Sequence, residues 1–136
     1  MQEEGILLKH TPLIAVVDDD QSVREGLENL INSVGFGVKL FASAEDFLDS
    51  DVSSQTDCAI FDVRLPGISG LELQQRLVAD GQRLPIVIIT AQGDERTQDE
   101  AVAAGAIAFL KKPFKEEVLL AALESALKRN GGEAVS

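Results

Sequence analysis

Chemically reactive side chains follow four short apolar runs of this 136-residue chain, at the point where each run ends. They are Asp18 and Asp19 after the first of these runs, Asp62 after the second, Thr90 after the third, and Lys112 after the fourth. If the runs are parallel strands of one sheet, their carboxyl ends lie at the same edge, where ligands of open α/β sheets bind. Three carboxylates, one hydroxyl and one ammonium group would then converge there.

Such a group of side chains favours phosphoryl chemistry with a hard metal ion. Carboxylates packed together repel one another and raise each other's pKa unless a cation compensates. Oxygen ligands that leave coordination positions open suit Mg²⁺, which also accepts phosphate oxygens. A carboxylate such as Asp62 can accept a phosphoryl group covalently, and the transfer needs charge neutralisation and positioning more than acid–base chemistry.

The elements that would position these residues alternate along the chain. Strands are predicted at 13–17, 36–41, 58–61, 86–89 and 107–110, because continuous apolar runs are typical of strands buried on both faces. Between and after them, helical spacing predicts helices at 23–34, from the cap Ser43 through Leu48, at 71–78, at 96–104 and from Glu116 to about Lys128. This alternation predicts an α/β fold with one parallel sheet and helices on both faces.

Length and composition predict a single domain. With 45% hydrophobic residues in 136, the chain can form one core of ordinary size. We divide it into an N-terminal extension at 1–11, a domain at 12–129, and a disordered tail or linker start at 130–136. No apolar run is long enough to span a bilayer, and no secretory signal pattern is present. A cytoplasmic location without membrane contact is therefore expected.

The charge and the single cysteine exclude some functions. The formal net charge of −11 disfavours direct binding of nucleic acid, which is itself a polyanion. It suits a bound cation or a basic protein partner. Cys58 has no motif that pairs it with His10, the one histidine of the chain, so we interpret it as a small buried apolar residue.

Four motifs in register resemble the response-regulator receiver domain of bacterial two-component systems. They are Val16-Val17-Asp18-Asp19-Asp20, Phe61-Asp62-Val63-Arg64-Leu65-Pro66-Gly67, Ile88-Ile89-Thr90-Ala91 and Leu110-Lys111-Lys112-Pro113-Phe114. The resemblance covers about residues 12 to 128. Further matches resemble the FixJ-like branch, whose members usually carry a C-terminal LuxR-type helix-turn-helix; these matches are Ser22-Val23-Arg24, Ser43-Ala44-Glu45, Ser69-Gly70-Leu71-Glu72-Leu73 and Gly93-Asp94.

The resemblance implies a flavodoxin-like (βα)₅ doubly wound fold with a five-stranded sheet, and a phosphoacceptor that is not a turnover enzyme. Asp62 would accept the phosphoryl group from a sensor histidine kinase. Asp19, Asp62 and the backbone carbonyl of Arg64 would bind Mg²⁺, and Asp18 would assist through a water molecule. Thr90 would hydrogen-bond a phosphoryl oxygen, and Lys112 would pair with the phosphate.

The resemblance also implies a switch. Thr90 would move toward the phosphoryl group while Phe109, the aromatic residue of the switch, turns inward. Arg64 and Gln92 occupy the positions that tune the lifetime of the phosphoryl group. Phosphorylation would shift the population of one face, built from 96–104, 107–111 and the last helix, and so control a partner, an output domain or homodimerisation. The output is expected to be transcriptional regulation.

The sequence departs from the family pattern at two positions. Ala108 stands where many relatives have an acidic residue, so no salt bridge can form from that position. Gln92 stands where FixJ-like relatives often have histidine. Asn130-Gly131-Gly132 suits the start of a linker to an output domain.

Two alternatives remain open from the residues themselves. In the first, the chain is a haloacid-dehalogenase-type phosphatase, because Asp18 and Asp20 have the Asp-x-Asp spacing of a nucleophile and an acid. That hypothesis leaves Asp62 unexplained. In the second, the chain is a receiver-like docking module that works without phosphorylation, which would bind its partner equally well after Asp62→Asn.

Overall fold

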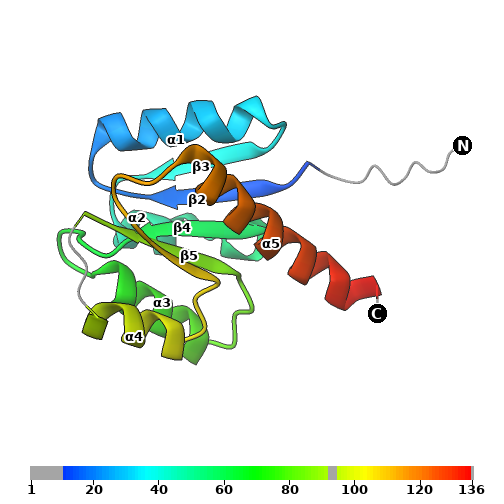
Figure 1. The fold of residues 1–136 in the computed structure, drawn as a ribbon. Coiled ribbons are helices and arrows are strands. Elements are labelled where there is room, and N and C mark those ends of the chain that lie inside the picture. Colours follow the sequence, from blue (N-terminus) through cyan, green and yellow to red (C-terminus); the bar gives the residue numbers. More distant parts are fainter. Residues whose placement is uncertain (1–10, 92–94, 136) are drawn as a thin grey trace, which may run out of the picture.

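Five parallel strands form one sheet in the computed structural model, which describes residues 11–91 and 95–135, with backbone alone for 129–135. The strands lie in the order β3-β2-β4-β5-β6 (Figure 1). Their bounds are β2 Leu13–Val17, β3 Gly37–Phe41, β4 Cys58–Asp62, β5 Ile86–Thr90 and β6 Ala108–Lys111. The prediction of a doubly wound, flavodoxin-like parallel sheet is confirmed.

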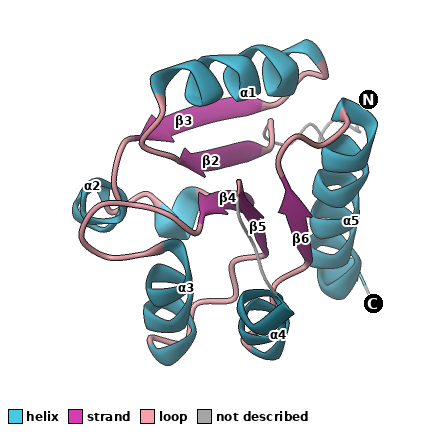
Figure 2. Ribbon diagram, turned by 60° about the vertical axis from the view of Figure 1, so that its left-hand side comes forward, coloured by secondary structure: helices cyan, strands magenta, loops and turns pink. Residues whose placement is uncertain are grey.

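Helices cover both faces of this sheet. Their bounds are α1 Gln21–Ser33, α2 Ala44–Ser50, α3 Gly70–Ala79, α4 Glu95–Ala103 and α5 Glu116–Val135, with a single-turn helix η1 at Ser53–Gln55. Figure 2 shows α1 and α5 on one face and α2, α3 and α4 on the other. No helix in the described ranges has the length and apolar character that crossing a membrane requires.

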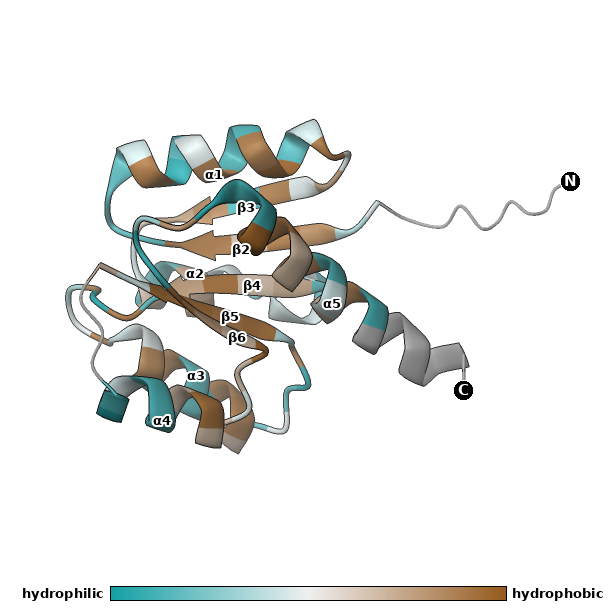
Figure 3. Cartoon of the chain, viewed as in Figure 1, coloured by the Kyte–Doolittle hydropathy of each residue, from teal (hydrophilic) through white to brown (hydrophobic). Residues whose placement is uncertain are grey.

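The core is split into two layers by the sheet, because successive strand residues point to opposite faces. In β4, Cys58 and Ile60 belong to the layer with α1 and α5, while Ala59 and Phe61 belong to the layer with α2, α3 and α4. The strands are accordingly apolar along most of their length (Figure 3). Cys58 is fully buried and burial raises the pKa of its thiol to about 12, which confirms it as a packing residue.

The strand order places a topological switch point between β2 and β4. From β2 the chain first moves outward to β3 and then returns to β4 on the other side of β2. Val17, the last residue of β2, pairs with Phe61, which precedes Asp62. The residues that follow these two strands therefore lie next to each other, where α/β sheets bind ligands.

Caps and turns define most of the helix ends. Ser43 accepts a hydrogen bond from the Asp46 N–H at 3.0 Å and caps α2, as predicted. Gly35 follows α1 with φ +91°, and Gly105 follows α4 with φ +97°. These left-handed conformations favour glycine at helix ends, so the predicted stops at both positions are confirmed.

The last helix is longer than predicted. It continues to Val135 rather than ending near Lys128, so the backbone of 130–135 is helical. Gly131 and Gly132 cost about 1 kcal/mol each within a helix. The stretch 114–136 contains no proline that would end the helix, and Glu133 and Ala134 have high helix propensity. The domain boundary at 129 stays a prediction, and residues 1–10 of the proposed N-terminal extension lie outside the described residues.

Candidate functional site

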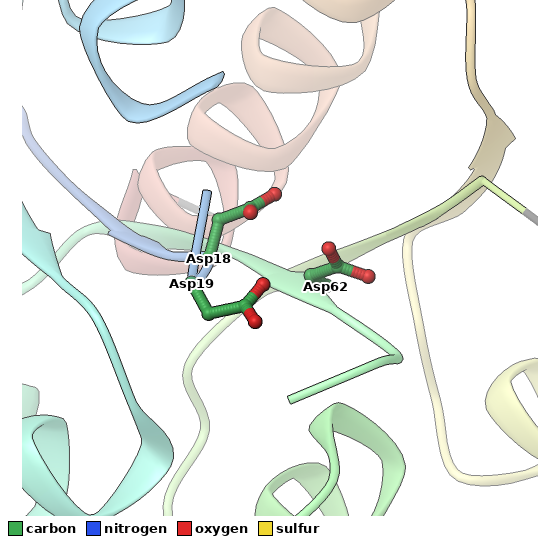
Figure 4. A group of neighbouring side chains, drawn as sticks. All are labelled: Asp18, Asp19 and Asp62. Atoms are coloured by element: carbon green, nitrogen blue, oxygen red, sulfur yellow. The ribbon is translucent and has the colours of Figure 1, made fainter. Parts of the chain in front are cut away.

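The reactive side chains are brought to one edge of the sheet. Asp18 and Asp19 follow β2, Asp62 ends β4, Thr90 ends β5, and Lys112 follows β6. One carboxylate oxygen from each of Asp18, Asp19 and Asp62 lies within 4.8 Å of the other two. Figure 4 shows these three side chains gathered where the two adjacent strands end.

Lys112 joins the two buried carboxylates of this site. Its Nζ lies 3.0 Å from Asp18 Oδ2 and 3.1 Å from Asp62 Oδ2. The side chains of Asp18, Asp62 and Lys112 are 0%, 7% and 20% exposed. A single ammonium group therefore compensates two almost fully buried carboxylates, whose charges interact strongly with it.

The other oxygen of each buried carboxylate is held by the backbone. Asp62 Oδ1 accepts from the Arg64 N–H at 2.9 Å, and Asp18 Oδ1 accepts from the Asp20 N–H at 2.9 Å. Each carboxylate thus accepts one hydrogen bond from a backbone N–H of the following turn and one from Lys112. This arrangement fixes the orientation of both side chains before any ligand binds.

The electrostatic balance differs between Asp62 and Lys112. Burial raises the pKa of Asp62, the negative charge of Asp18 raises it further, and the hydrogen bonds from Arg64 and Lys112 oppose the shift. Burial lowers the pKa of Lys112, but hydrogen bonds and charge interactions with Asp18 and Asp62 outweigh burial, so the net pKa lies above its usual value. Lys112 is therefore positively charged at neutral pH. Asp62 needs a nearby positive charge to favour its ionised form.

Asp19 and Asp20 have different surroundings from Asp18. Asp19 is exposed although its carboxylate is part of the acidic cluster. Asp20 caps α1, because its Oδ1 accepts from the Ser22 N–H at 2.9 Å and from the Ser22 hydroxyl at 2.7 Å. These hydrogen bonds lower the pKa of Asp20, which disfavours the phosphatase alternative in which Asp20 acts as a general acid.

Two supporting residues were not predicted to belong to the site. Arg24 of α1 donates from Nη1 to the Asp18 carbonyl at 2.7 Å and so ties the β2–α1 turn to the helix. Gly70 packs directly against the Asp62 carbonyl and the Val63 backbone, where a Cβ would overlap them. Both residues stand in motifs that carry the resemblance, yet only tertiary contact shows what they do.

The predicted switch residues lie on the neighbouring strands. Thr90 is fully buried, and its carbonyl accepts from the Lys112 N–H at 2.7 Å. Phe109 of β6 is partly buried and packs on the layer with α2, α3 and α4. Gln92, the proposed tuning position, lies outside the described residues, and Arg64 is exposed beside Asp62.

The donor set fits a magnesium ion. All the acidic groups offer hard oxygen atoms, and the exposed Asp19 leaves one side of the cluster open to water and to a substrate. Mg²⁺ prefers such oxygen ligands and usually retains several water molecules. The same opening would admit a phosphoryl group between the metal ligands and Lys112, so the site can support transfer to a carboxylate.

The chain is similar to known proteins over most of its length. The response regulator receiver domain family matches residues 14–124. The transcriptional regulatory protein TdiR of Thauera aromatica is 45% identical over 86% of this chain and 52% of TdiR. FixJ of Bradyrhizobium diazoefficiens is 43% identical over 85% of this chain and 57% of FixJ. The chain thus spans about half the length of these curated relatives.

Solved structures show the same similarity. The response regulator StyR superposes with a TM-score of 0.85 at 48% identity, covering 92% of this chain and 63% of StyR. A FixJ-N structure superposes with a TM-score of 0.78 at 34% identity, covering 88% of this chain and 95% of that one.

Proposed function

This chain belongs to the response regulator receiver domain family, with FixJ-like relatives, and we propose that it accepts one phosphoryl group on Asp62 from a sensor histidine kinase in a Mg²⁺-dependent reaction. One observation supports this above all others. Asp62 ends the central strand β4 with one oxygen on the Arg64 N–H and the other on Lys112, beside two further carboxylates. The carboxylate proposed as nucleophile, a positive charge and the carboxylates proposed as metal ligands thus lie together.

The proposed metal ligands are Asp19, Asp62 and the backbone carbonyl of Arg64, with Asp18 acting through a water molecule. The bound ion would neutralise charge on the oxygens of the phosphoryl group during transfer. Asp62 is already oriented by the Arg64 N–H, so little reorganisation is needed before attack. The bond from phosphorus to a carboxylate oxygen of Asp62 forms as the bond to the histidine nitrogen of the kinase breaks.

Lys112 and Thr90 would stabilise the product. The Lys112 ammonium, 3.1 Å from Asp62 Oδ2, would transfer its contact to a phosphoryl oxygen once Asp62 carries the acyl phosphate. The Thr90 hydroxyl would donate to another phosphoryl oxygen. A charged lysine and a neutral hydroxyl act by electrostatics and position, without accepting a proton, as expected for phosphoryl transfer.

The proposed output is a change in the face formed by α4, β6 and α5. Movement of Thr90 toward the phosphoryl group would let Phe109 turn inward and shift the population of this face. α4 contributes one buried residue, Ala101, to the core, so it can move at low cost. We propose that this face controls a phosphorylation-dependent homodimer or a transcriptional output domain, while this chain does not itself bind nucleic acid.

The test is phosphorylation by a small donor. Wild-type protein and Asp62→Asn are incubated with acetyl phosphate, with Mg²⁺ or with EDTA, and their intact masses are measured at short time intervals. We expect one added phosphoryl group in the wild type with Mg²⁺ and none in the other three samples. The same adduct in Asp62→Asn, or in EDTA, would contradict the proposal.

A further inference from the structure

Asp19 is held differently from the other two carboxylates of the acidic site. Asp18 and Asp62 each accept hydrogen bonds from a backbone N–H and from Lys112. The Asp19 side chain is exposed, and no hydrogen bond or ion pair in the described part of the chain fixes its carboxylate. It nevertheless lies beside Asp18 and points toward Asp62 (Figure 4). The position of this carboxylate therefore depends on the backbone that carries it.

The peptide unit that joins Asp18 to Asp19 is bound by Arg24 of α1. The Arg24 side chain is half-buried, and its Nη1 donates to the Asp18 carbonyl at 2.7 Å. A hydrogen bond from a charged donor is shorter and stronger than one between neutral groups. Because this carbonyl belongs to the same planar unit as the Asp19 N–H, the bond fixes the orientation of the backbone from which the Asp19 side chain departs.

The start of α1 holds Arg24 against this peptide unit. Asp20 caps the helix, and the Arg24 N–H donates to the Asp20 carbonyl at 3.0 Å. On the other side, the Asp18 N–H donates to the Phe41 carbonyl of β3 at 3.1 Å. The turn is thus anchored to the sheet before Asp19 and to the helix after it.

We propose that Arg24 is a positioning residue, whose hydrogen bond to the Asp18 carbonyl raises the Mg²⁺ affinity of the site by orienting Asp19. This inference rests on the proposed function, in which Asp19 is a metal ligand. Loss of a group that orients a metal ligand typically lowers metal affinity about 10- to 100-fold. The charge of Arg24 acts in the opposite direction, because a positive charge beside the acidic cluster repels a divalent cation. Positioning and charge therefore predict opposite effects of removing Arg24.

The test compares Mg²⁺ binding by the wild-type chain and by Arg24→Met, in ¹H–¹⁵N NMR titrations followed at the amides of Asp19 and Arg64. Methionine keeps an unbranched apolar side chain without the donors or the charge. We expect the Kd for Mg²⁺ to be about tenfold higher in Arg24→Met than in wild type. Arg83→Met is the matched control, because Arg83 is exposed and precedes β5 at the opposite edge of the sheet. It removes the same charge and should keep the wild-type Kd.

A second variant and a second measurement separate positioning from a folding defect. Arg24→Gln is neutral and too short to reach the carbonyl in the same way, so it should raise the Kd as Arg24→Met does. A merely structural role would lower the urea unfolding midpoint in EDTA without changing the Kd of the folded protein. A wild-type or lower Kd in both folded variants would overturn the inference alone. A wild-type chain that binds no Mg²⁺ would instead contradict the proposed function, and the inference with it.

Discussion

At Asp62, the burial of the side chain opposes the negative charge that its proposed function requires. The function proposed for this residue needs an ionised carboxylate, yet burial and the nearby Asp18 both favour its protonated form and raise its pKa. Lys112 and the Arg64 N–H offset part of this cost. The residue is therefore expected to reduce the stability of the metal-free protein, as residues of functional sites often do.

Replacing Asp62 by asparagine should stabilise the metal-free protein by about 1 kcal/mol at neutral pH, since it removes a buried charge beside Asp18. A raised pKa in the folded state lowers stability as pH rises through that pKa. The advantage of Asp62→Asn should therefore shrink as pH falls through the acidic range. Urea unfolding of both proteins at a series of pH values measures this. An advantage that grows toward low pH would contradict the account.

Lys112→Met should leave Asp18 and Asp62 without their shared cation. We expect a loss of about 2 kcal/mol of unfolding free energy at neutral pH, less than for a fully buried pair because the lysine is partly exposed. Saturating Mg²⁺, at about 100 times its Kd, should add about 2.7 kcal/mol to the unfolding free energy through binding and so offset this loss. Lys111→Met is the matched control, since Lys111 is exposed. Equal unfolding midpoints for the two variants in EDTA would argue against the ion-pair role of Lys112.

At the scale of elements, the turn between β4 and α3 positions Asp62. Gly70 begins α3 and its N–H donates to the Val63 carbonyl at 3.1 Å, so the helix starts next to Asp62 at the end of β4. A side chain there would overlap the Asp62 carbonyl. This close approach explains why a glycine stands at the first position of a helix that Ser69 already caps.

Gly70→Ala should destabilise the protein by about 1–3 kcal/mol, the usual cost of overpacking, and slow phosphorylation because Asp62 must move. Gly26→Ala is the matched control. Gly26 lies in α1 with open space around a built Cβ, so alanine should add about 0.5–1 kcal/mol there. Thermal unfolding and the rate of adduct formation report both effects. Wild-type stability and rate in Gly70→Ala would exclude the packing role.

α4 should be the least protected of the helices on its face of the sheet. Ala101 is its one buried residue, whereas Gly70, Leu73, Gln74 and Leu77 are buried in α3. Native-state hydrogen exchange should show faster exchange at α4 amides than at α3 amides. Equal protection of α3 and α4 amides would mean that α4 is as stable locally as α3, and would argue against the proposed switch.

Most elements could be predicted because their signals are local. Apolar runs of four or five residues identified four of the strands, the mixed stretch 36–41 identified the other, and Gly35 and Gly105 marked helix ends correctly. The end of α5 was wrong, because Gly131 and Gly132 suggest a linker while the backbone stays helical. Arg24 and Gly70 were not identified as site residues, because their roles depend on contacts between turns and neighbouring elements.

At the scale of the whole molecule, two exposed apolar side chains lie on the face that is proposed to switch. Val102 of α4 is 57% exposed and Val118 of α5 is 45% exposed. Two copies of a chain with a net charge of −11 repel each other. A dimer through this face would therefore need apolar contact between the copies, and should become stronger as salt screens their charge.

Beryllofluoride with Mg²⁺, which imitates the phosphoryl group, should convert the protein from monomer to dimer in light scattering. Val102→Asp should weaken that dimer at least tenfold, since it buries an unpaired charge at a cost of more than about 1.4 kcal/mol. Val34→Asp is the matched control, because Val34 is 43% exposed at the end of α1, which is not part of the face formed by α4, β6 and α5. Equal molar masses with and without beryllofluoride would exclude this dimer.

The convergence of the site follows from the architecture as a whole. Each site residue taken alone has an ordinary explanation, as a turn former, a solvated lysine or a surface hydroxyl. Parallel strands place their carboxyl ends together, and so the position of Asp18, Asp62, Thr90 and Lys112 could be predicted once the strands were recognised. The joint contact of Lys112 with two carboxylates could not be predicted, since it depends on side-chain geometry.

The central claim is that Asp62, among the clustered aspartates, is the phosphoryl acceptor. Protein phosphorylated by acetyl phosphate in Mg²⁺ is treated with borohydride, which reduces an acyl phosphate to an alcohol, and the modified peptide is then sequenced by mass spectrometry. We predict homoserine at position 62 and unmodified aspartate at positions 18, 19 and 20. Reduction at any of those three positions with Asp62 intact would contradict the account and return the assignment of the nucleophile to the β2–α1 turn.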